Sequence, residues 1–352
     1  MNIAVLVSGG VDSSVALRLL KEAGHNVTAF YIKIWLEDDV SHLGGCPWQE
    51  DVGYVSQICQ KMDVPFQVVP LQKEYWEKVV AYTIEQVKAG RTPNPDVFCN
   101  TWIKFGVFLD EYGDKFDKVA TGHYAQVEEK NGFYHLKCAP DPVKDQTYFL
   151  SYLNQKQLSK ILFPIGHLQK EQVRDLAAKY DLPNKERKDS QGICFLGKLK
   201  FDDFIKNYVG EKKGDMIEAE TGKKLGEHNG FWFHTIGQRR GSGLSGGPWY
   251  VVSKDPEQNI VYVSKNYYSD DKLRDELTVE KINWIAQKPS NKNLQVKLRH
   301  GEKKYNCTIS SLDNGDMRVK LSERDQGIAP GQFAVFYDGD ICLGSGIISK
   351  TL

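Results

Sequence analysis

Two cysteines of the chain stand in surroundings that favour thiol chemistry. Cys99 lies in a loop that two prolines make rigid, residues 91–100 (RTPNPDVFCN), and Asp96 comes three residues before it. A helical pattern begins soon after Cys99, and a thiol near a helix N-terminus has a lowered pKa and is a better nucleophile. Cys194 follows a glycine in residues 185–196 (KERKDSQGICFL), where nearby basic side chains favour the thiolate. Taken alone, a thiol such as Cys99 is more often buried and structural, and neither cysteine is conclusive, but one in each of two loops suggests a relay between two cysteines.

A second stretch, residues 8–14 (SGGVDSS), has the composition of a phosphate-binding loop. The five apolar residues before it predict a buried strand of a parallel sheet, and the residues after it follow helical spacing as far as Gly24. A strand, a tight glycine turn and a helix N-terminus together present free backbone N–H groups to an anion. The sequence signatures of a Walker A loop and of a dinucleotide fingerprint are both absent. The alternative is an ordinary glycine turn between a strand and a helix.

Strands and helices that alternate along the first 200 residues would position these loops. Besides the first strand, apolar runs predict strands at residues 26–35 and 65–71 and from residue 118 to Gly122. Helical spacing predicts helices at residues 51–62, 73–88, 154–162 and 169–180. The alternation predicts an α/β domain with a doubly wound parallel sheet. Ligands bind such sheets at the carboxyl ends of the strands, where we expect Gly122 and His123.

The character of the sequence changes near residue 201. Residues 227–248 are too rich in glycine for a packed helix, and they combine aromatic side chains with Gln238, Arg239 and Arg240. This composition suits an RNA backbone, and a structural linker is the alternative. From about residue 277, short alternating runs recur every 8–12 residues and predict a small antiparallel barrel or sandwich. We therefore expect three parts: the α/β domain at residues 1–200, a small central α+β domain that contacts tRNA at residues 201–272, and an antiparallel β-barrel at residues 273–352.

The composition of the chain narrows the class of protein. Its 352 residues carry a formal net charge of zero, so any contact with nucleic acid must come from local basic patches. The seven cysteines include no CxxC pair, which argues against a disulfide framework and a zinc knuckle. No apolar run approaches the length of a membrane span, so we expect no membrane partner and a reducing cytoplasm as the location.

Together these motifs resemble the bacterial tRNA-specific 2-thiouridylases, the MnmA family, over nearly the whole chain. The first motif alone resembles the loop of the wider PP-loop superfamily of ATP pyrophosphatases, whose fold is that of the adenine nucleotide alpha hydrolases. The combination of Asp-x-x-Cys in one loop with a later GICF is specific to a much narrower group of proteins. The matching segments are SGGVDSS (8–14), AGRTPNPDVFCN (89–100), ATGHY (120–124), KDQTYFL (144–150), KDSQGICF (188–195), HTIGQRRG (234–241) and PGQFAVFY (330–337).

The resemblance implies ATP-dependent thiolation of the wobble uridine of tRNA. The C2 oxygen of uridine is a poor leaving group, so it would first attack the α-phosphate of ATP, and pyrophosphate would leave. Mg²⁺ is implied because the phosphate charges must be neutralised, although no residue is assigned as its ligand. Relatives often have Met where this chain has Ile32, so we expect only apolar packing there. The implied nucleotide-binding residues are Leu6, Val7, Ser8, Gly9, Gly10, Val11, Asp12, Ser13, Ser14, Ile32 and Gly122.

By the same resemblance, Cys194 carries a persulfide sulfur received from a donor protein, and Cys99 helps to deliver it. A disulfide between Cys99 and Cys194 would form as the sulfur leaves, and its reduction would reset the enzyme. Asp96 would handle a proton or contact the target base. The implied substrates are the tRNAs for Lys, Glu and Gln. The implied tRNA contacts are Asn94, Pro95, Asp96, His123, Lys144, Asp145, Gln146, Arg299, His300 and Gln332.

Three alternatives to this interpretation stay open at the level of sequence. An iron–sulfur cluster could replace the persulfide if a third ligand joined the two cysteines, and Cys46 is the available thiol, although a chance surface cysteine is the simpler explanation. A PP-loop ligase that acts on a small molecule would not need the two loop cysteines. A non-catalytic tRNA-binding protein would use ATP only as a structural ligand.

Overall fold

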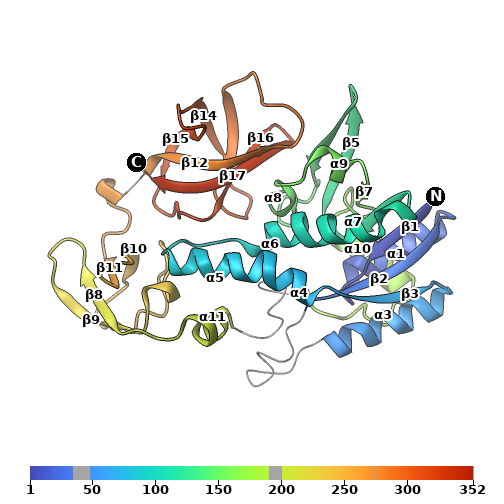
Figure 1. Ribbon diagram of the computed structural model, residues 1–352, viewed down its shortest axis with the longest axis horizontal. Helices are drawn as coiled ribbons and strands as arrows, with labels where there is room; N and C mark the ends of the chain where they lie inside the picture. Colours follow the sequence, from blue (N-terminus) through green and yellow to red (C-terminus); the bar gives the residue numbers. More distant parts are fainter. Residues whose placement is uncertain (35–47, 190–199, 273, 352) are drawn as a thin grey trace.

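The computed structural model describes residues 1–34, 48–189, 200–272 and 274–351. Figure 1 shows a parallel sheet with its helices, an antiparallel barrel beside it, and a small sheet at the far end of the long axis. Cys46 and Cys194 lie outside the described residues, as do most of the segments that contain them. None of the described helices is both long and apolar enough to span a membrane.

The N-terminal part contains a five-stranded parallel sheet. The strand order is β3-β2-β1-β4-β7. The chain places β2 and β3 on one side of β1 and then returns to place β4 and β7 on the other side. The carboxyl ends of β1 and β4 therefore form the switch point of the sheet. The strands are β1 (Asn2–Leu6), β2 (Asn26–Lys33), β3 (Phe66–Pro70), β4 (Lys118–Thr121) and β7 (Ile161–Leu162). The prediction of a doubly wound parallel sheet is confirmed.

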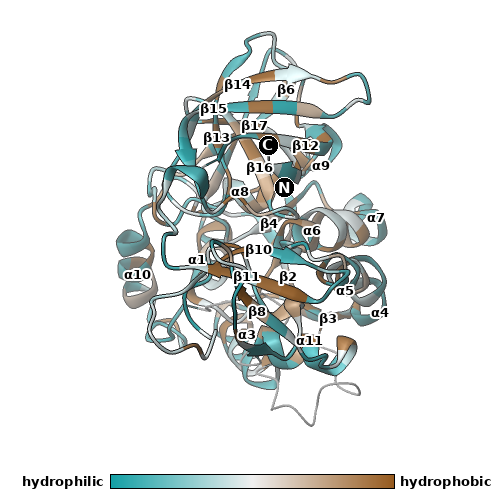
Figure 2. Ribbon diagram, turned by 90° about the vertical axis from the view of Figure 1, so that its left-hand side faces the viewer, coloured by the Kyte–Doolittle hydropathy of each residue, from teal (hydrophilic) through white to brown (hydrophobic). Residues whose placement is uncertain are grey.

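Helices cover both faces of this sheet because its strands are apolar on both sides. Ile3 and Val5 pack with α1 and α3, whereas Ala4 and Leu6 belong to the core beneath η3 and α7. Figure 2 shows hydrophobic β2 inside the molecule and largely hydrophilic α10 at its edge. The N-terminal helices are α1 (Val11–Glu22), α3 (Trp48–Met62), α4 (Gln72–Tyr75), η2 (Trp76–Val80), α5 (Ala81–Lys88), α6 (Pro95–Phe98), η3 (Cys99–Val107), α7 (Phe108–Tyr112), η4 (Gly113–Lys115), α8 (Thr147–Leu150), α9 (Gln155–Leu158) and α10 (Lys170–Lys179).

The central part begins with helix α11 (Phe201–Val209), followed by a four-stranded sheet of order β10-β11-β8-β9. The strands β11 and β8 are parallel, and the other pairs are antiparallel. The elements are β8 (Gly214–Glu218), β9 (Lys224–His228), η5 (Phe231–Phe233), β10 (Tyr250–Asp255), β11 (Ile260–Ser264) and η6 (Asp270–Lys272). The sheet with its helices forms the small α+β unit that the sequence predicts.

The C-terminal strands close into a six-stranded antiparallel barrel. Its order is β12-β15-β14-β13-β16-β17, and β17 pairs again with β12 to complete the circle. Alternate residues of each strand point into the barrel and form its core, which confirms the predicted alternation. The strands are β12 (Arg274–Trp284), β13 (Asn293–Lys297), β14 (Tyr305–Ser311), β15 (Met317–Asp325), β16 (Phe333–Asp338) and β17 (Ile341–Thr351).

A hairpin of the N-terminal part extends the barrel sheet. The strands β5 (Ala125–Lys130) and β6 (Phe133–Cys138) follow β4 directly, and β6 pairs with β17 through Leu136 and Cys342. One hydrophobic core then contains buried residues from both ends of the chain, among them Phe98 and Phe333. The N-terminal part and the barrel are therefore joined by a continuous sheet and by a common core.

Candidate active site

The glycine loop between β1 and α1 is held in shape by its own hydroxyl groups. The backbone N–H of Ser8 donates to Ser13 Oγ (3.2 Å), and the hydroxyls of Ser13 and Ser14 donate to the carbonyl of Gly10 at 3.0 and 2.9 Å. Gly9 has φ +75°, a conformation that side chains disfavour. The loop then leads into α1, whose first-turn N–H groups have no acceptor within the helix.

Gly122 approaches this loop from the end of β4. A Cβ at Gly122 would lie 2.6 Å from the backbone nitrogen of Ser13 and 2.8 Å from the carbonyl carbon of Asp12. A side chain there would cover the N–H groups that point out of the first turn of α1. The absence of one keeps the switch point open, and the cradle therefore fits the phosphates of a nucleotide.

The apolar residues predicted to bind nucleotide shape the surroundings of the cradle. Leu6, Val7 and Val11 are buried, and they belong to three different core clusters around the loop. Ile32 is half-buried at the end of β2 and packs against the core beneath η3. These side chains can offer an adenosine only apolar contacts.

Two residues far along the chain form a second wall of the cradle. The amide of Asn184 donates to Gly9 O (2.8 Å) and to Ser14 Oγ (3.0 Å), and Arg187 Nη1 donates to Gly9 O at 3.0 Å. Asn184 is 1% exposed, and its Oδ1 has no hydrogen-bond partner among the described residues. In the sequence, the basic residues before Cys194 suggested that they favour its thiolate. In the structure, one of them, Arg187, contacts the phosphate loop instead.

A chain of charges runs from the phosphate loop to Asp189. Lys170 donates to both carboxylate oxygens of Asp12 (2.7 and 2.9 Å) and pairs with Asp189 at 2.8 Å. Tyr124 also donates to Asp12 (2.9 Å), and Lys144 pairs with Asp189 at 2.8 Å. Partial burial raises the pKa of Asp189, but hydrogen bonds from Lys144 and Lys170 outweigh it and lower the pKa to about 2. Asp12 and Asp189 are thus fixed carboxylates beside the cradle.

The loop that contains Cys99 turns into a helix at Asn94. Asn94 has extended backbone angles (φ −118°, ψ 93°), Pro95 opens α6, and Asp96 lies in the first turn. Cys99 starts η3, so Asp96 and Cys99 are three residues apart on one helical face. Cys99 is 2% exposed. Because the helix begins at Pro95, Cys99 lies one turn further from the helix N-terminus than the sequence suggested.

The helix η3 is a π-helix over nine residues, a form that often marks functional sites. The side chain of Gln157 in α9 donates to two of its carbonyl oxygens, Thr101 O (2.8 Å) and Phe105 O (2.7 Å). These buried hydrogen bonds link the helix that begins at Cys99 to α9.

The other four described cysteines are poor nucleophiles. Burial raises the pKa of Cys59 to about 11 and that of Cys307 to about 12. Burial also raises the pKa of Cys138, and that of Cys342 lies well above its usual value. These four thiols belong to the hydrophobic cores and carry no role in our proposals.

The Cys99 loop docks on the barrel. The guanidinium of Arg91 pairs with Glu280 at 2.7 Å. The N–H of Thr92 donates to the carbonyl of Pro330 (2.7 Å), and Gln332 Nε2 donates to Thr92 O at 2.9 Å. Gln332, implied by the family resemblance to contact tRNA, therefore holds the loop in which Asn94, Pro95 and Asp96 lie.

His123 lies between the phosphate loop and helix η3, which begins at Cys99. It follows Gly122 directly, and its ring lies 6.3 Å from that of Phe105 in η3. Its Nδ1 is 2.7 Å from Thr121 Oγ1. Burial, together with the charge of Lys104, lowers the pKa of His123 well below its usual value. The imidazole is neutral at physiological pH, so it can act as a hydrogen-bonding group but not as a cation.

None of the residues 144–146, which the family resemblance implies as tRNA contacts, is fully exposed. Asp145 is 3% exposed and pairs at 3.1 Å with Lys297 of the barrel, itself 3% exposed. The side chain of Gln146 accepts a hydrogen bond from the N–H of Tyr124 at 2.9 Å. The expectation that Asp145 contacts RNA does not fit this burial, since its carboxylate is enclosed in the junction. Lys144 remains partly exposed beside Asp189.

Arg299 and His300, two of the three barrel residues implied as tRNA contacts, follow strand β13. Arg299 pairs with Asp325 at 2.5 Å and donates to Gly327 O at 3.0 Å, while half of its side chain stays exposed. The ring of His300 stacks on Phe149 with 4.6 Å between centroids. Burial lowers the pKa of His300, so its ring is mainly neutral at pH 7. His300 thus contacts the N-terminal part, whereas the hydrogen bonds of Arg299 stay within the barrel.

Of the aromatic residues near the predicted RNA-binding arginines, Phe231 is buried, and Trp232 and Phe233 pack against the N-terminal core. Arg239 and Arg240 are exposed. The aromatic residues are thus structural in this fold, whereas the arginines are accessible.

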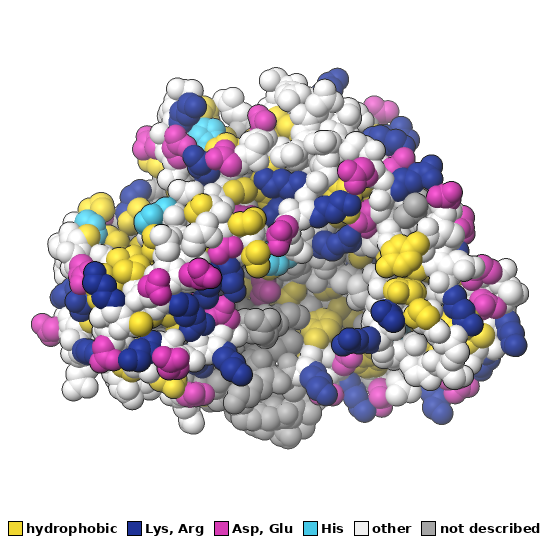
Figure 3. Space-filling view, turned by 180° about the vertical axis from the view of Figure 1, so that it is seen from behind, with side chains coloured by type: hydrophobic (Ala, Val, Ile, Leu, Met, Phe, Trp, Pro, Cys, Tyr) yellow, Lys and Arg dark blue, Asp and Glu magenta, His cyan; other side chains and the backbone are white. Residues whose placement is uncertain are grey.

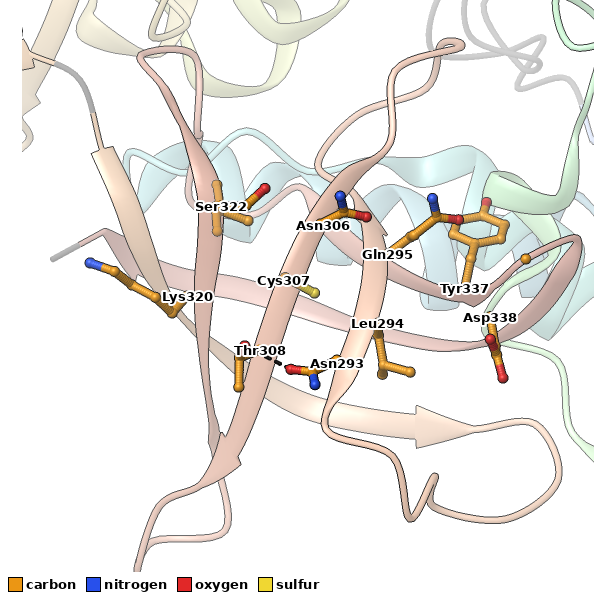
Figure 4. Close-up of a pocket in the computed structure, with 12 residues that line it drawn as sticks. Asn293, Leu294, Gln295, Asn306, Cys307, Thr308, Lys320, Ser322, Tyr337 and Asp338 are labelled. Carbon is orange, nitrogen blue, oxygen red and sulfur yellow. Dashed lines mark hydrogen bonds between the residues drawn. The ribbon is translucent and has the colours of Figure 1, made fainter.

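A separate open groove of about 490 Å³ lies on the barrel and is lined by residues of β13, β14, β15 and the end of β16 (Figure 4). It includes no residue of the phosphate loop or of the Cys99 loop. Among the residues that the structure describes, no group of three His, Cys, Asp or Glu side chains is placed to hold a metal ion. The groove and the candidate site are therefore distinct features.

A parallel sheet with a glycine phosphate loop at its switch point defines an α/β protein of the nucleotide-binding class. Family models agree along the chain: "tRNA methyl transferase HUP domain" matches residues 1–198, "tRNA methyl transferase PRC-barrel domain" residues 202–265, and "Aminomethyltransferase beta-barrel domain" residues 274–348. The chain belongs to the tRNA-specific 2-thiouridylase MnmA family.

Three relatives that carry this family name cover the chain almost completely. The protein of Parabacteroides distasonis is 50% identical over an alignment of 356 positions that covers 99% of each chain. That of Porphyromonas gingivalis is 48% identical over 361 aligned positions, which again cover 99% of each chain. A third, from Bacteroides thetaiotaomicron, is 48% identical over 357 aligned positions, which cover 99% of this chain and 100% of the relative.

Proposed function

We propose that this chain is an ATP-dependent enzyme that transfers sulfur to uridine in tRNA. The observation that carries the proposal is a phosphate cradle kept open by Gly122, in a chain half identical over its full length to a named tRNA-specific 2-thiouridylase. The cradle accounts for ATP use, and the relatives indicate the RNA and the sulfur. The reaction we propose is the replacement of the C2 oxygen of the wobble uridine by sulfur.

The first step activates the base. The C2 oxygen attacks the α-phosphate of ATP, the bond to pyrophosphate breaks, and AMP becomes attached to the base. The N–H groups of the loop at Gly9 and Gly10 stabilise the charge on the departing pyrophosphate. Mg²⁺ would enter with the phosphates, because it usually keeps water ligands and few protein ones. Asp12, in the first turn of α1, is a carboxylate that could contact it.

The second step transfers sulfur. The terminal sulfur of a persulfide on Cys194, supplied by a donor protein, bonds to C2 as AMP leaves. The Cys99 thiolate attacks Sγ of Cys194, so the sulfur–sulfur bond breaks, the thiolated base is released, and a disulfide between the two cysteines remains. A reductant then restores both thiols. Asp96, on the same helical face as Cys99, contacts the base or takes up a proton.

The wobble uridine must leave its stack to reach this site. Asn94 and Pro95 would meet the flipped base beside Asp96, with neutral His123 near the phosphate loop. Lys144, beside Asp189, and Arg299 and His300 of the barrel are the candidates for contacts with the rest of the tRNA. Figure 3 shows a hollowed face with Lys and Arg side chains along its rim, which suits an RNA backbone.

A product assay tests this function. The purified chain is mixed with ATP, Mg²⁺, a persulfide donor and unmodified tRNA for Lys, Glu or Gln, next to Cys99→Ala, Cys194→Ala and the buried control Cys59→Ala. We expect AMP and pyrophosphate only with tRNA, and thiolated RNA only when both loop cysteines are present.

Other outcomes of the assay contradict the proposal in specific ways. Thiolation by either loop variant excludes the two-cysteine relay. AMP formation without RNA favours a ligase that acts on a small molecule. No AMP in the presence of tRNA favours a tRNA-binding protein without catalysis. The Cys59→Ala variant should thiolate like the wild type, because Cys59 packs beneath the opposite face of the sheet.

A further inference from the structure

The guanidinium of Arg187 occupies the position at the phosphate loop that a side chain on Gly9 would take. A Cβ at Gly9 would lie 2.9 Å from Arg187 Nη1 and 2.8 Å from the Cα of Asp51. Nη1 also donates to the carbonyl of Gly9 at 3.0 Å. The backbone of Arg187 is fixed in turn, because Arg174 donates to its carbonyl at 2.7 Å. A cation is thus built into the cradle, 178 residues away from the loop in sequence.

The counter-ion of Arg187 is a carboxylate and not a phosphate. Nη2 donates to Oδ1 of Asp51 at 2.5 Å, and the two side chains are only 22% and 17% exposed. Asp51 lies in the first turn of α3, and its second oxygen accepts a weaker hydrogen bond from Tyr31 at 3.3 Å. Two different elements therefore bring opposite charges together directly above Gly9.

The surroundings of this ion pair disfavour the charged form of Asp51. Burial raises the pKa of Asp51, and the hydrogen bond from Arg187 only partly compensates. A guanidinium binds carboxylate and phosphate oxygens with the same fork of N–H donors. A polyphosphate in the cradle would bring more negative charge to Arg187 than Asp51 does, and it would repel Asp51.

We propose that Arg187 binds the pyrophosphate portion of ATP and that Asp51 occupies this position as its counter-ion until the nucleotide displaces it. The proposal rests on the use of ATP proposed above. In this arrangement Asp51 keeps a buried cation neutralised before substrate binds. It then competes with the phosphates, so that binding of ATP and release of pyrophosphate exchange one anion for another.

A purely structural ion pair predicts a different result at Asp51. If the pair only tied α3 to the loop, Asp51→Asn would loosen the cradle and weaken the binding of phosphates. If Asp51 competes with phosphate, Asp51→Asn frees Arg187, and the binding of phosphates becomes tighter. The sign of the change at Asp51 therefore separates the two explanations.

Calorimetric titration of the full chain with inorganic pyrophosphate, ATP and adenosine, without RNA, tests the proposal. We expect Arg187→Gln to raise the Kd for pyrophosphate and ATP about 10- to 100-fold, because a charge-assisted hydrogen bond is lost. Asp51→Asn should lower both Kd values several-fold. The Kd for adenosine should not change in either variant. Arg18→Gln, which removes an arginine on the outer side of α1, is the matched control and should bind like the wild type.

Melting temperatures of all variants show whether they are folded, and Arg187→Lys, which keeps the charge but loses the fork, should bind with intermediate Kd. The proposal is overturned if folded Arg187→Gln binds pyrophosphate like the wild type, or if Asp51→Asn binds it more weakly. A wild-type chain that binds no ATP overturns the proposed function together with this inference. A wild type that binds ATP and thiolates tRNA, with variants that contradict these expectations, overturns the inference alone.

Discussion

Lys254 shows how a single, partly buried charge responds to its surroundings. Its ammonium donates to the carbonyl of His234 at 2.9 Å within the central part of the chain. Loss of hydration on burial lowers the pKa of Lys254 to about 8. A lysine in the unfolded chain titrates near 10.4, so the folded state disfavours the charged form. The folded chain therefore carries an unfavourable charge at neutral pH.

This charge predicts a specific pH dependence of stability. Because the folded pKa lies below the unfolded one, wild-type stability is reduced below pH 8 and recovers as the pH rises from 8 to about 10.4. We expect Lys254→Met to abolish this recovery, on the order of 2 kcal/mol, while the exposed control Lys265→Met retains it. Urea unfolding at pH 7 to 10 measures the difference. A wild type and a Lys254→Met variant with parallel pH profiles would rule out a depressed pKa.

At the scale of elements, the Cys99 loop depends on the barrel for its position. Gly331 has φ +94°, and a Cβ there would lie 2.8 Å from the backbone nitrogen of Thr92 and 2.9 Å from Arg91 Cβ. Only a glycine therefore allows the barrel to touch the backbone of the loop that leads to Cys99. The phosphate cradle makes no use of this contact.

We expect Gly331→Ala to lower the kcat of thiolation about 10- to 100-fold, because misplacement of a reacting group by about 1 Å has effects of that size. The Kd of ATP should stay unchanged, since the cradle is built from other elements. Gly339→Ala is the control, because Gly339 also has positive φ (+60°) but has no atom within 4 Å of a Cβ. Single-turnover thiolation and ATP titration measure the two effects. Equal losses in both variants would mean that strain in the glycine backbone, and not the loop contact, is responsible.

At the scale of the whole molecule, the N-terminal part and the barrel share a buried ion pair. Asp145 also accepts hydrogen bonds from the N–H of Ala139 (3.1 Å) and the hydroxyl of Thr147 (2.8 Å). Lys297 lies beside the ring of Tyr337, with 5.5 Å between Nζ and the centroid. The pair thus fastens the two parts together inside their common core.

We expect Asp145→Asn to destabilise the chain by about 3–5 kcal/mol, because it leaves the charge of Lys297 buried without a partner. Lys297→Met combined with Asp145→Asn should cost less than the sum of the single changes. Urea unfolding gives these free energies. Additive losses would show that the two side chains do not stabilise each other.

The sequence predicted the parallel sheet and the barrel because their strands leave clear patterns. The hairpin β5–β6 was not predicted, although Asn131 and Gly132, both with positive φ, form the Asn-Gly pair typical of tight hairpins. Its pairing with β17 joins residues about 200 positions apart, which no local pattern can indicate.

The candidate site was predictable only in part. The glycine loop and the Cys99 loop carry local motifs, so both could be placed on their elements in advance. Distant segments pack together to bring Asn184, Arg187 and Asp51 to Gly9. In the sequence, these residues cannot be distinguished from polar and charged side chains that lie in solvent. The burial of Asp145 likewise depends on a barrel strand that is 152 residues away.

The common core of the two ends of the chain has a consequence for synthesis on the ribosome. The ring of Phe333 lies 5.3 Å from that of Phe98, and β17 pairs with the edge of β6. The phosphate loop can form from early residues, but the surroundings of Cys99 are complete only after β17 has been made. A product that stops before β17 would therefore have a phosphate cradle without the packing around Cys99. A chain that includes β17 would hold Cys99 in an ordered setting.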